Sequence, residues 1–149
     1  MNSKKQSEKN LISVIGYGTF ITRRYWSDKK NVDIVHVKNY SRIFPEGNWY
    51  PYVLKSEGSS FWALKFDINE EELEQLDVYE GVPLGLFERV KIEVLLSNQK
   101  KIEAYIYVPT EETIKTQNLS LSQDIHDRWK EEIKKYPKIM SRFPKLIDS

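Results

Sequence analysis

Strand patterns dominate the chain between residues 11 and 109, and one well-marked helix interrupts them. In these stretches apolar residues run together or alternate with polar ones, which is typical of strands with one or two buried faces. The predicted strands cover residues 11–16, 31–43, 49–55, 61–67, 87–96 and 102–108. Turn-forming residues at 56–59 and 97–100 predict a hairpin at each place. Because strand and helix do not alternate regularly, we expect an α+β domain with a closed or nearly closed sheet flanked by helices.

The interrupting helix has the clearest boundaries in the sequence. Asn69 is a good N-cap residue, and Glu72 stands three positions later, where it completes a capping box. Gly81 ends the helix, which leaves Glu80 at its C-terminal end. A carboxylate there costs a few tenths to about 1 kcal/mol, because this end of a helix carries partial negative charge. Such a misplaced residue is often functional; the alternative is one more exposed carboxylate in an acidic run.

A second helix is predicted from Ser120, where Gln123 completes another capping box. Four apolar residues recur at every fourth position and predict one buried stripe: Leu121, Ile125, Trp129 and Ile133. Pro137 is expected to end this helix. We therefore predict a single domain over residues 1–149, with a core at about 11–109 and a C-terminal helical extension at about 120–149.

Composition excludes several classes of function. The 23 basic and 22 acidic residues nearly cancel, so no overall field attracts nucleic acid or an anionic membrane. The chain has no cysteine and only two histidines, which stand far apart, so neither a thiolate nucleophile nor a zinc or iron site is expected. Oxygen-ligand sites for magnesium or calcium stay open. The polar opening segment, residues 1–10, has no run typical of a signal peptide or a membrane span, so we expect a cytoplasmic protein.

The segment at residues 14–20 predicts a strand that runs into a tight loop. Gly16 and Gly18 permit a close turn, whose backbone N–H groups could bind an anion or a carbonyl oxygen. A dinucleotide fingerprint is excluded, because Ile21 stands where that motif needs glycine or alanine. The alternative is that the two glycines only make a turn.

Two segments together resemble a known family. Residues 14–20 resemble the aromatic-Tyr-Gly-Thr/Ser-Leu loop of the gamma-glutamylcyclotransferase-like, or AIG2-like, family, and residues 76–81 resemble its Leu-Asp-x-Tyr-Glu-Gly segment. Tyr50-Pro51, Phe87-x-Arg89 and residues 104–108 follow in the family's order, so the resemblance covers roughly residues 12–109. Phe20 departs from the pattern by replacing leucine, and Phe87 stands where tyrosine is usual, which leaves the substrate's identity open.

The resemblance implies a small mixed β-barrel with a pocket between the glycine loop and the helix end. It implies that Glu80 is a general acid/base, and that Tyr17, Gly18, Thr19 and Phe20 hold a gamma-glutamyl group. Two further residues, Arg89 and Tyr107, are candidates for shaping the pocket. The implied reaction releases 5-oxoproline from a small gamma-glutamyl amide or peptide without a cofactor. The alternative is a non-catalytic ligand-binding or interaction module; nucleic-acid binding is the least favoured, and the oligomeric state stays open.

Overall fold

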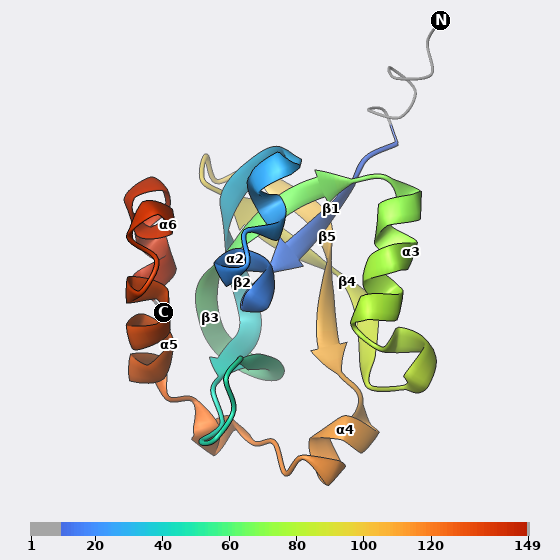
Figure 1. Ribbon diagram of the computed structural model, residues 1–149, viewed down its shortest axis with the longest axis vertical. Helices are drawn as coiled ribbons and strands as arrows, with labels where there is room; N and C mark the ends of the chain where they lie inside the picture. The colour runs from blue at the N-terminus through green and yellow to red at the C-terminus, as the bar shows by residue number, and fades with distance from the viewer. Residues whose placement is uncertain (1–9, 149) are drawn as a thin grey trace, which may run out of the picture.

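The computed structural model describes residues 10–148, so nearly all of the polar opening segment lies outside the described residues. Five strands close into a barrel in the order β1-β3-β2-β4-β5 (Figure 1). Their bounds are β1 Ile12–Gly16, β2 Lys30–Ile43, β3 Tyr52–Ile68, β4 Phe87–Leu96 and β5 Lys101–Pro109. Neighbouring strands are antiparallel except β1 and β5, which pair in parallel and close the barrel. The predicted α+β fold with a mixed barrel is therefore confirmed.

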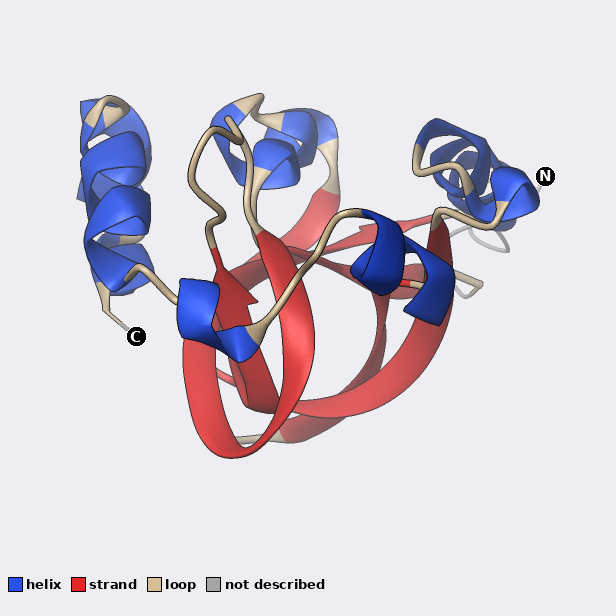
Figure 2. Ribbon diagram, turned by 90° about the horizontal axis from the view of Figure 1, so that it is seen from below, coloured by secondary structure: helices blue, strands red, loops and turns tan. Residues whose placement is uncertain are grey.

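The helices gather toward one end of the barrel (Figure 2). The α-helices are α2 Thr19–Thr22, α3 Glu70–Tyr79, α4 Glu111–Thr116, α5 His126–Lys134 and α6 Pro137–Arg142. Short 3₁₀ helices lie at Tyr25–Asp28, Val82–Leu84, Leu121–Gln123 and, after α6, Pro144–Ile147. Within residues 10–148, no helix combines the length and apolar character that crossing a bilayer requires.

The strand prediction was wrong at residues 49–67, which were expected to form two strands joined by a hairpin. The structure has one long strand, β3, which pairs with β2 on both sides of residues 56–59. Those residues form a bulge opposite Asn39, whose side chain accepts a hydrogen bond from the N–H of Gly58 at 3.1 Å. Gly58 and Asn39 both have positive φ, at 84° and 68°. The turn-forming residues thus bend the strand instead of reversing it.

The barrel wall of β1 is buried on both faces. Val14 and Ile15 are adjacent and fully buried, yet they belong to two separate apolar clusters. Successive side chains of a strand point to opposite faces, so one cluster lies on each side of the wall. This explains why β1 has adjacent apolar residues, Val14 and Ile15, instead of a strictly alternating pattern.

Helix α3 begins as predicted. The side chain of Asn69 accepts from the N–H of Glu72 at 2.8 Å, and the Glu72 carboxylate accepts from the N–H of Asn69 at 3.2 Å. This capping box fixes the start of the helix. Leu73 and Leu76 bury its apolar side against the cluster that contains Val14.

The second helix prediction was right about the cap but wrong about the helix. Ser120 and Gln123 form a capping box, but it starts only a single 3₁₀ turn, and α5 begins at His126. Two hydrogen bonds, one from Ser41 in β2 and one from Phe44 just after it, keep residues 123–124 from continuing as a helix. The Gln123 carbonyl accepts from the N–H of Phe44 at 3.0 Å, and Ser41 donates to Asp124 at 3.0 Å.

The predicted apolar stripe is consequently buried over only half of its length. Trp129 and Ile133 are fully buried, whereas Leu121 and Ile125 are exposed. The chain then turns at Pro137 into α6, which the sequence patterns did not predict.

Candidate active site

A cavity of about 330 Å³ lies between the loop that follows β1 and the C-terminal end of α3. Residues 17–20, 49–51 and 78–81 line it, together with Leu84, Leu86 and Phe87. The two segments singled out in the sequence, one around Gly18 and one around Glu80, therefore meet at one cavity. Closure of the barrel brings them together, because β1 pairs with both β3 and β5.

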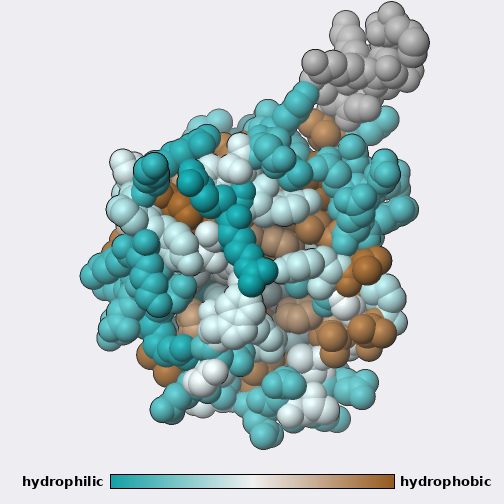
Figure 3. All heavy atoms as spheres, viewed as in Figure 1, coloured by the Kyte–Doolittle hydropathy of each residue, from teal (hydrophilic) through white to brown (hydrophobic). Residues whose placement is uncertain are grey.

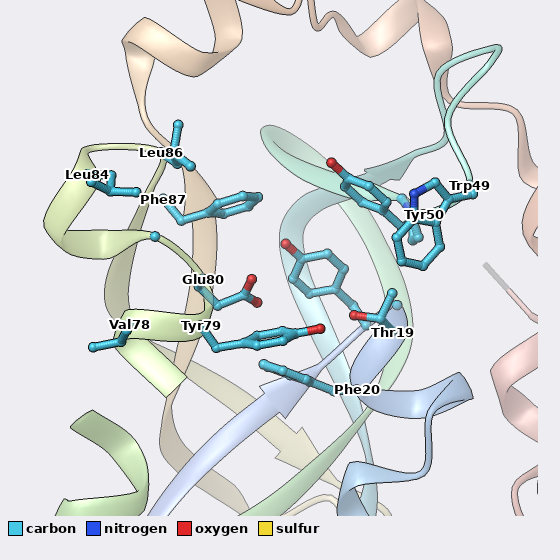
Figure 4. A pocket seen from close by; sticks show the side chains of 14 residues that line it. Thr19, Phe20, Trp49, Tyr50, Val78, Tyr79, Glu80, Leu84, Leu86 and Phe87 are labelled. Carbon is cyan, nitrogen blue, oxygen red and sulfur yellow. The ribbon is translucent and has the colours of Figure 1, made fainter. Parts of the chain in front are cut away.

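Glu80 occupies the C-cap position of α3, and the turn behind it explains its orientation. Its N–H donates to the Leu76 carbonyl at 2.8 Å, and the N–H of Gly81 donates to the Val78 carbonyl at 3.0 Å. Gly81 has a φ of 75°, and a Cβ atom there would lie 2.8 Å from Cδ1 of Leu86. Glycine is therefore required for the turn that follows Glu80. Figure 4 shows the Glu80 carboxylate pointing into the cavity, with Thr19, Trp49 and Tyr50 on the opposite side.

The carboxyl group of Glu80 is suited to carry a proton near neutral pH. Burial alone raises the pKa of Glu80 from 4.5 to about 7, because the surroundings disfavour the charged form. Within residues 10–148, its carboxylate makes neither an ion pair nor a hydrogen bond. Near pH 7 both protonation states are then populated, which a general acid/base needs.

The glycine loop packs too tightly for side chains at two positions. A Cβ atom on Gly18 would lie 2.9 Å from the ring of Pro51, and one on Gly16 would lie 2.8 Å from Cβ of Phe20. The Gly18 carbonyl accepts from the N–H groups of Ile21 and Thr22, which starts α2. Within the described chain, the N–H groups of Thr19 and Phe20 donate to no backbone carbonyl, as is usual in a first helical turn.

Tyr17 is held in place by a buried arginine that no sequence pattern indicated. Arg42 donates through Nε to the Tyr17 carbonyl at 2.9 Å and through a terminal nitrogen to the Trp62 carbonyl at 2.9 Å. Its guanidinium lies 4.1 Å from the ring centre of Trp129 on α5, and burial lowers the pKa of Arg42 to about 9. The Tyr17 hydroxyl donates to the Tyr107 carbonyl at 2.8 Å. Tyr17 is therefore fixed at both its backbone and its hydroxyl.

Arg89 and Tyr107 lie outside the cavity lining and meet at another residue of α3. Asp77 accepts a hydrogen bond from the Tyr107 hydroxyl at 2.6 Å and forms an ion pair with Nε of Arg89 at 3.1 Å. Burial and the bond to Asp77 raise the pKa of Tyr107. Asp77 stands one helical turn before Glu80, so these contacts tie the last turn of α3 to β4 and β5. Asp77 belongs to the segment at residues 76–81 that resembles the family's motif, but no pattern in the sequence indicated its contacts with Arg89 and Tyr107.

The upper walls of the cavity come from two segments, one that precedes β3 and one that follows α3. Trp49 and Tyr50 were expected in a strand but precede β3, and Trp49 is 59% exposed. In Figure 4 they face Leu84, Leu86 and Phe87 across the cavity. None of these side chains fills the space in front of Glu80.

These features define a barrel protein with a small-molecule pocket, in which the Glu80 carboxylate, of raised pKa and unpaired within the described residues, faces a glycine loop. The chain belongs to the family described as gamma-glutamyl cyclotransferase, AIG2-like, whose model matches residues 14–131. The match extends past residue 109 into α5, further than the motifs alone indicated.

Solved structures share the fold at low sequence identity. A gamma-glutamyl cyclotransferase is 16% identical, with a TM-score of 0.57 over 75% of this chain and 83% of that one. A protein of Arabidopsis thaliana is 21% identical, with a TM-score of 0.62 over 93% and 92%. A yeast gamma-glutamyl cyclotransferase specific to glutathione is 14% identical, with a TM-score of 0.56 over 91% and 89%. At these identities the likeness concerns the fold, and no curated protein matches the chain.

Proposed function

We propose that the protein is a gamma-glutamyl cyclotransferase that converts a small gamma-glutamyl amide or peptide to 5-oxoproline and a free amine or amino acid. The observation that carries the proposal is Glu80, an unpaired carboxylate with a pKa of about 7 that points into the cavity beside the glycine loop. Membership of the family supports the same reaction.

In the proposed reaction, the substrate's α-amine attacks its own γ-carbonyl carbon. The ionised Glu80 first takes a proton from the α-ammonium group, which frees the nitrogen lone pair. The new C–N bond closes a five-membered lactam and gives a tetrahedral intermediate. Glu80 then gives this proton to the nitrogen of the original amide as that C–N bond breaks. It also takes the second proton from the ring nitrogen and passes it to the freed amine. The α-ammonium nitrogen thus loses two protons and the released amine gains two and leaves as an ammonium, so atoms, protons and charge balance without water, metal or cofactor.

The loop from Tyr17 to Phe20 is proposed to hold the gamma-glutamyl group. The N–H groups of Thr19 and Phe20, which the described chain leaves without a backbone acceptor, would donate to the oxyanion that forms on the γ-carbonyl oxygen. Removal of one such donor in other enzymes costs about 3 kcal/mol of transition-state stabilisation. Arg89 and Tyr107 would act at a distance, since both contact Asp77 and thereby position the end of α3. The proposed location, the cytoplasm, stays a prediction.

The deciding experiment measures 5-oxoproline after incubation with a panel of gamma-glutamyl amines, gamma-glutamyl dipeptides and glutathione. We expect release from at least one of them, and loss of that release in Glu80→Gln. Absence of product from all substrates, or full activity in Glu80→Gln, would refute the proposal. Binding of a panel member without product would instead identify a non-catalytic ligand-binding module.

A further inference from the structure

Exposed apolar side chains concentrate around the cavity. Seven large hydrophobic residues of the described chain are exposed, and five of them line this one cavity: Trp49, Val78, Tyr79, Leu84 and Leu86. Hydrophobic side chains gather over the end of α3 and the segment that follows it (Figure 3). Burial of such surface is favourable at about 25 cal/mol per Å², so a concentration of it beside a pocket indicates a ligand with an apolar part.

These side chains form two facing walls above Glu80. Trp49 and Tyr50 make one wall, and Leu84, Leu86 and Phe87 make the other (Figure 4). We call this space, lined by these five residues, the apolar channel. The rings of Trp49 and Tyr50 contact edge to face at 4.9 Å, and Tyr50 is tied through Tyr52 to Phe87, whose rings stack at 5.8 Å. The two walls are therefore held at a fixed separation.

Among the described residues, the cavity lining contains no lysine or arginine, and its one carboxylate is Glu80. Arg23 contacts two rim residues, since its guanidinium lies 5.0 Å from the Trp49 ring and donates to the Tyr79 hydroxyl at 3.3 Å. Arg23 itself lines two neighbouring cavities and not this one. Between the two walls, a leaving group with its own carboxylate would lose water without meeting a cation of the lining, which is costly.

We infer that the apolar channel binds the leaving group, and that the protein prefers gamma-glutamyl amides of neutral, apolar amines over gamma-glutamyl amino acids and glutathione. The inference rests on the proposed function and specifies its substrate class. Glu80 and the loop act on the gamma-glutamyl half, which is common to all these substrates. The channel alone distinguishes the groups attached to it.

Two matched substrate pairs test the inference. Gamma-glutamylphenethylamide and gamma-glutamylphenylalanine differ only by a carboxylate on the leaving group. Gamma-glutamylphenethylamide and gamma-glutamylmethylamide differ in apolar area. We expect kcat/KM for the phenethylamide to exceed that for each of the other two by at least about tenfold, the usual scale for burying an apolar group or an unpaired charge.

A charge placed in the channel gives a second test. Leu84 is 79% exposed, so Leu84→Lys should leave the fold intact and supply the missing cation. The preference for the phenethylamide over gamma-glutamylphenylalanine should then fall by about tenfold, mainly through faster turnover of gamma-glutamylphenylalanine. Leu121→Lys is the control, because Leu121 is also exposed, at 45%, but lies outside the cavity.

The outcomes separate this inference from the proposed function. Equal kcat/KM for all three substrates, with 5-oxoproline formed, would overturn the channel's role and leave the cyclotransferase proposal standing. If neither these three substrates nor the wider panel released 5-oxoproline, both the channel's role and the cyclotransferase proposal would be overturned. If Leu84→Lys dissociated a dimer in sedimentation and left the substrate preference unchanged, the surface would belong to a second copy and the inference would be wrong.

Discussion

Replacement of Glu80 by glutamine removes the proposed proton carrier while nearly preserving the size of the side chain. General acid/base catalysis contributes about 10²- to 10⁴-fold to a rate, so kcat for 5-oxoproline release should fall by that factor. KM should change little, because the loop and the apolar channel are untouched. The same substitution has a second effect, on stability, which follows from the burial of the carboxyl group.

The sign of the stability effect follows from the raised pKa. Below about pH 4.5 Glu80 is protonated in both the folded and the unfolded chain, and burial carries no electrostatic cost. Above about pH 7 folding must bury a charge, and the raised pKa, from 4.5 to about 7, sets an upper limit of about 3 kcal/mol on that cost. Because the side chain keeps some contact with solvent, we expect about 1–2 kcal/mol. Glu80→Gln should therefore stabilise the protein at pH 8 by about this amount and have a much smaller effect at pH 5.

Urea unfolding at pH 5 and pH 8, alongside the 5-oxoproline assay, measures both effects. Glu74→Gln is the control, because Glu74 is exposed on the same helix and lies outside the cavity. An inactive Glu80→Gln that is more stable at pH 8 matches the reasoning. A variant that is destabilised equally at both pH values would show that Glu80 acts through structure, and a fully active one would refute its catalytic role.

Four further predictions follow from the same geometry. The kcat/KM of the wild type should rise with pH through about 7 and level off above it, because the ionised form of Glu80 accepts the proton; a flat profile would contradict this. Gly18→Ala should lower the free energy of unfolding by about 1–3 kcal/mol and reduce turnover, because the new Cβ would meet the Pro51 ring at 2.9 Å; wild-type values in both assays would be the opposing result. Tyr107→Phe should lower the free energy of unfolding by about 1–2 kcal/mol, because Asp77 loses a 2.6 Å hydrogen bond. It should also lower kcat more than it raises KM; an unchanged kcat would show that Asp77 does not position the site. Arg42→Met should cost about 2–4 kcal/mol, because the buried Tyr17 carbonyl and the part-buried Trp62 carbonyl lose their donor; a smaller loss in thermal unfolding would contradict this.

Local signals predicted the elements that contacts within a few residues determine. The capping box of Asn69 and Glu72 marked the start of α3, and Gly81 marked its end, so the position of Glu80 could be derived from the sequence. The alternating pattern of β4 and β5 likewise matched their bounds closely. These signals work because the hydrogen bonds they describe join neighbouring residues.

Features that depend on distant partners could not be predicted in this way. Whether residues 56–59 reverse the chain or only bend it depends on Asn39, which stands opposite them on β2. The failure of a helix to start at Ser120 depends on contacts with Ser41 and Phe44. At the site, the sequence indicated the loop and Glu80, but the walls of the channel follow from barrel closure, which no local pattern encodes.

Arg42 connects the C-terminal helices to the glycine loop. Its guanidinium lies between the Tyr17 carbonyl and the ring of Trp129, so α5 and the loop share one buried cation. If α5 detached, water would reach Arg42 and compete for the bond that fixes Tyr17. We therefore expect opening of the C-terminal helices to loosen the loop, and the slowest-exchanging amides of α5 to report how long the Arg42 bond to Tyr17 persists. A segment some fifty residues from Glu80 in the sequence would thereby influence how long the pocket stays assembled.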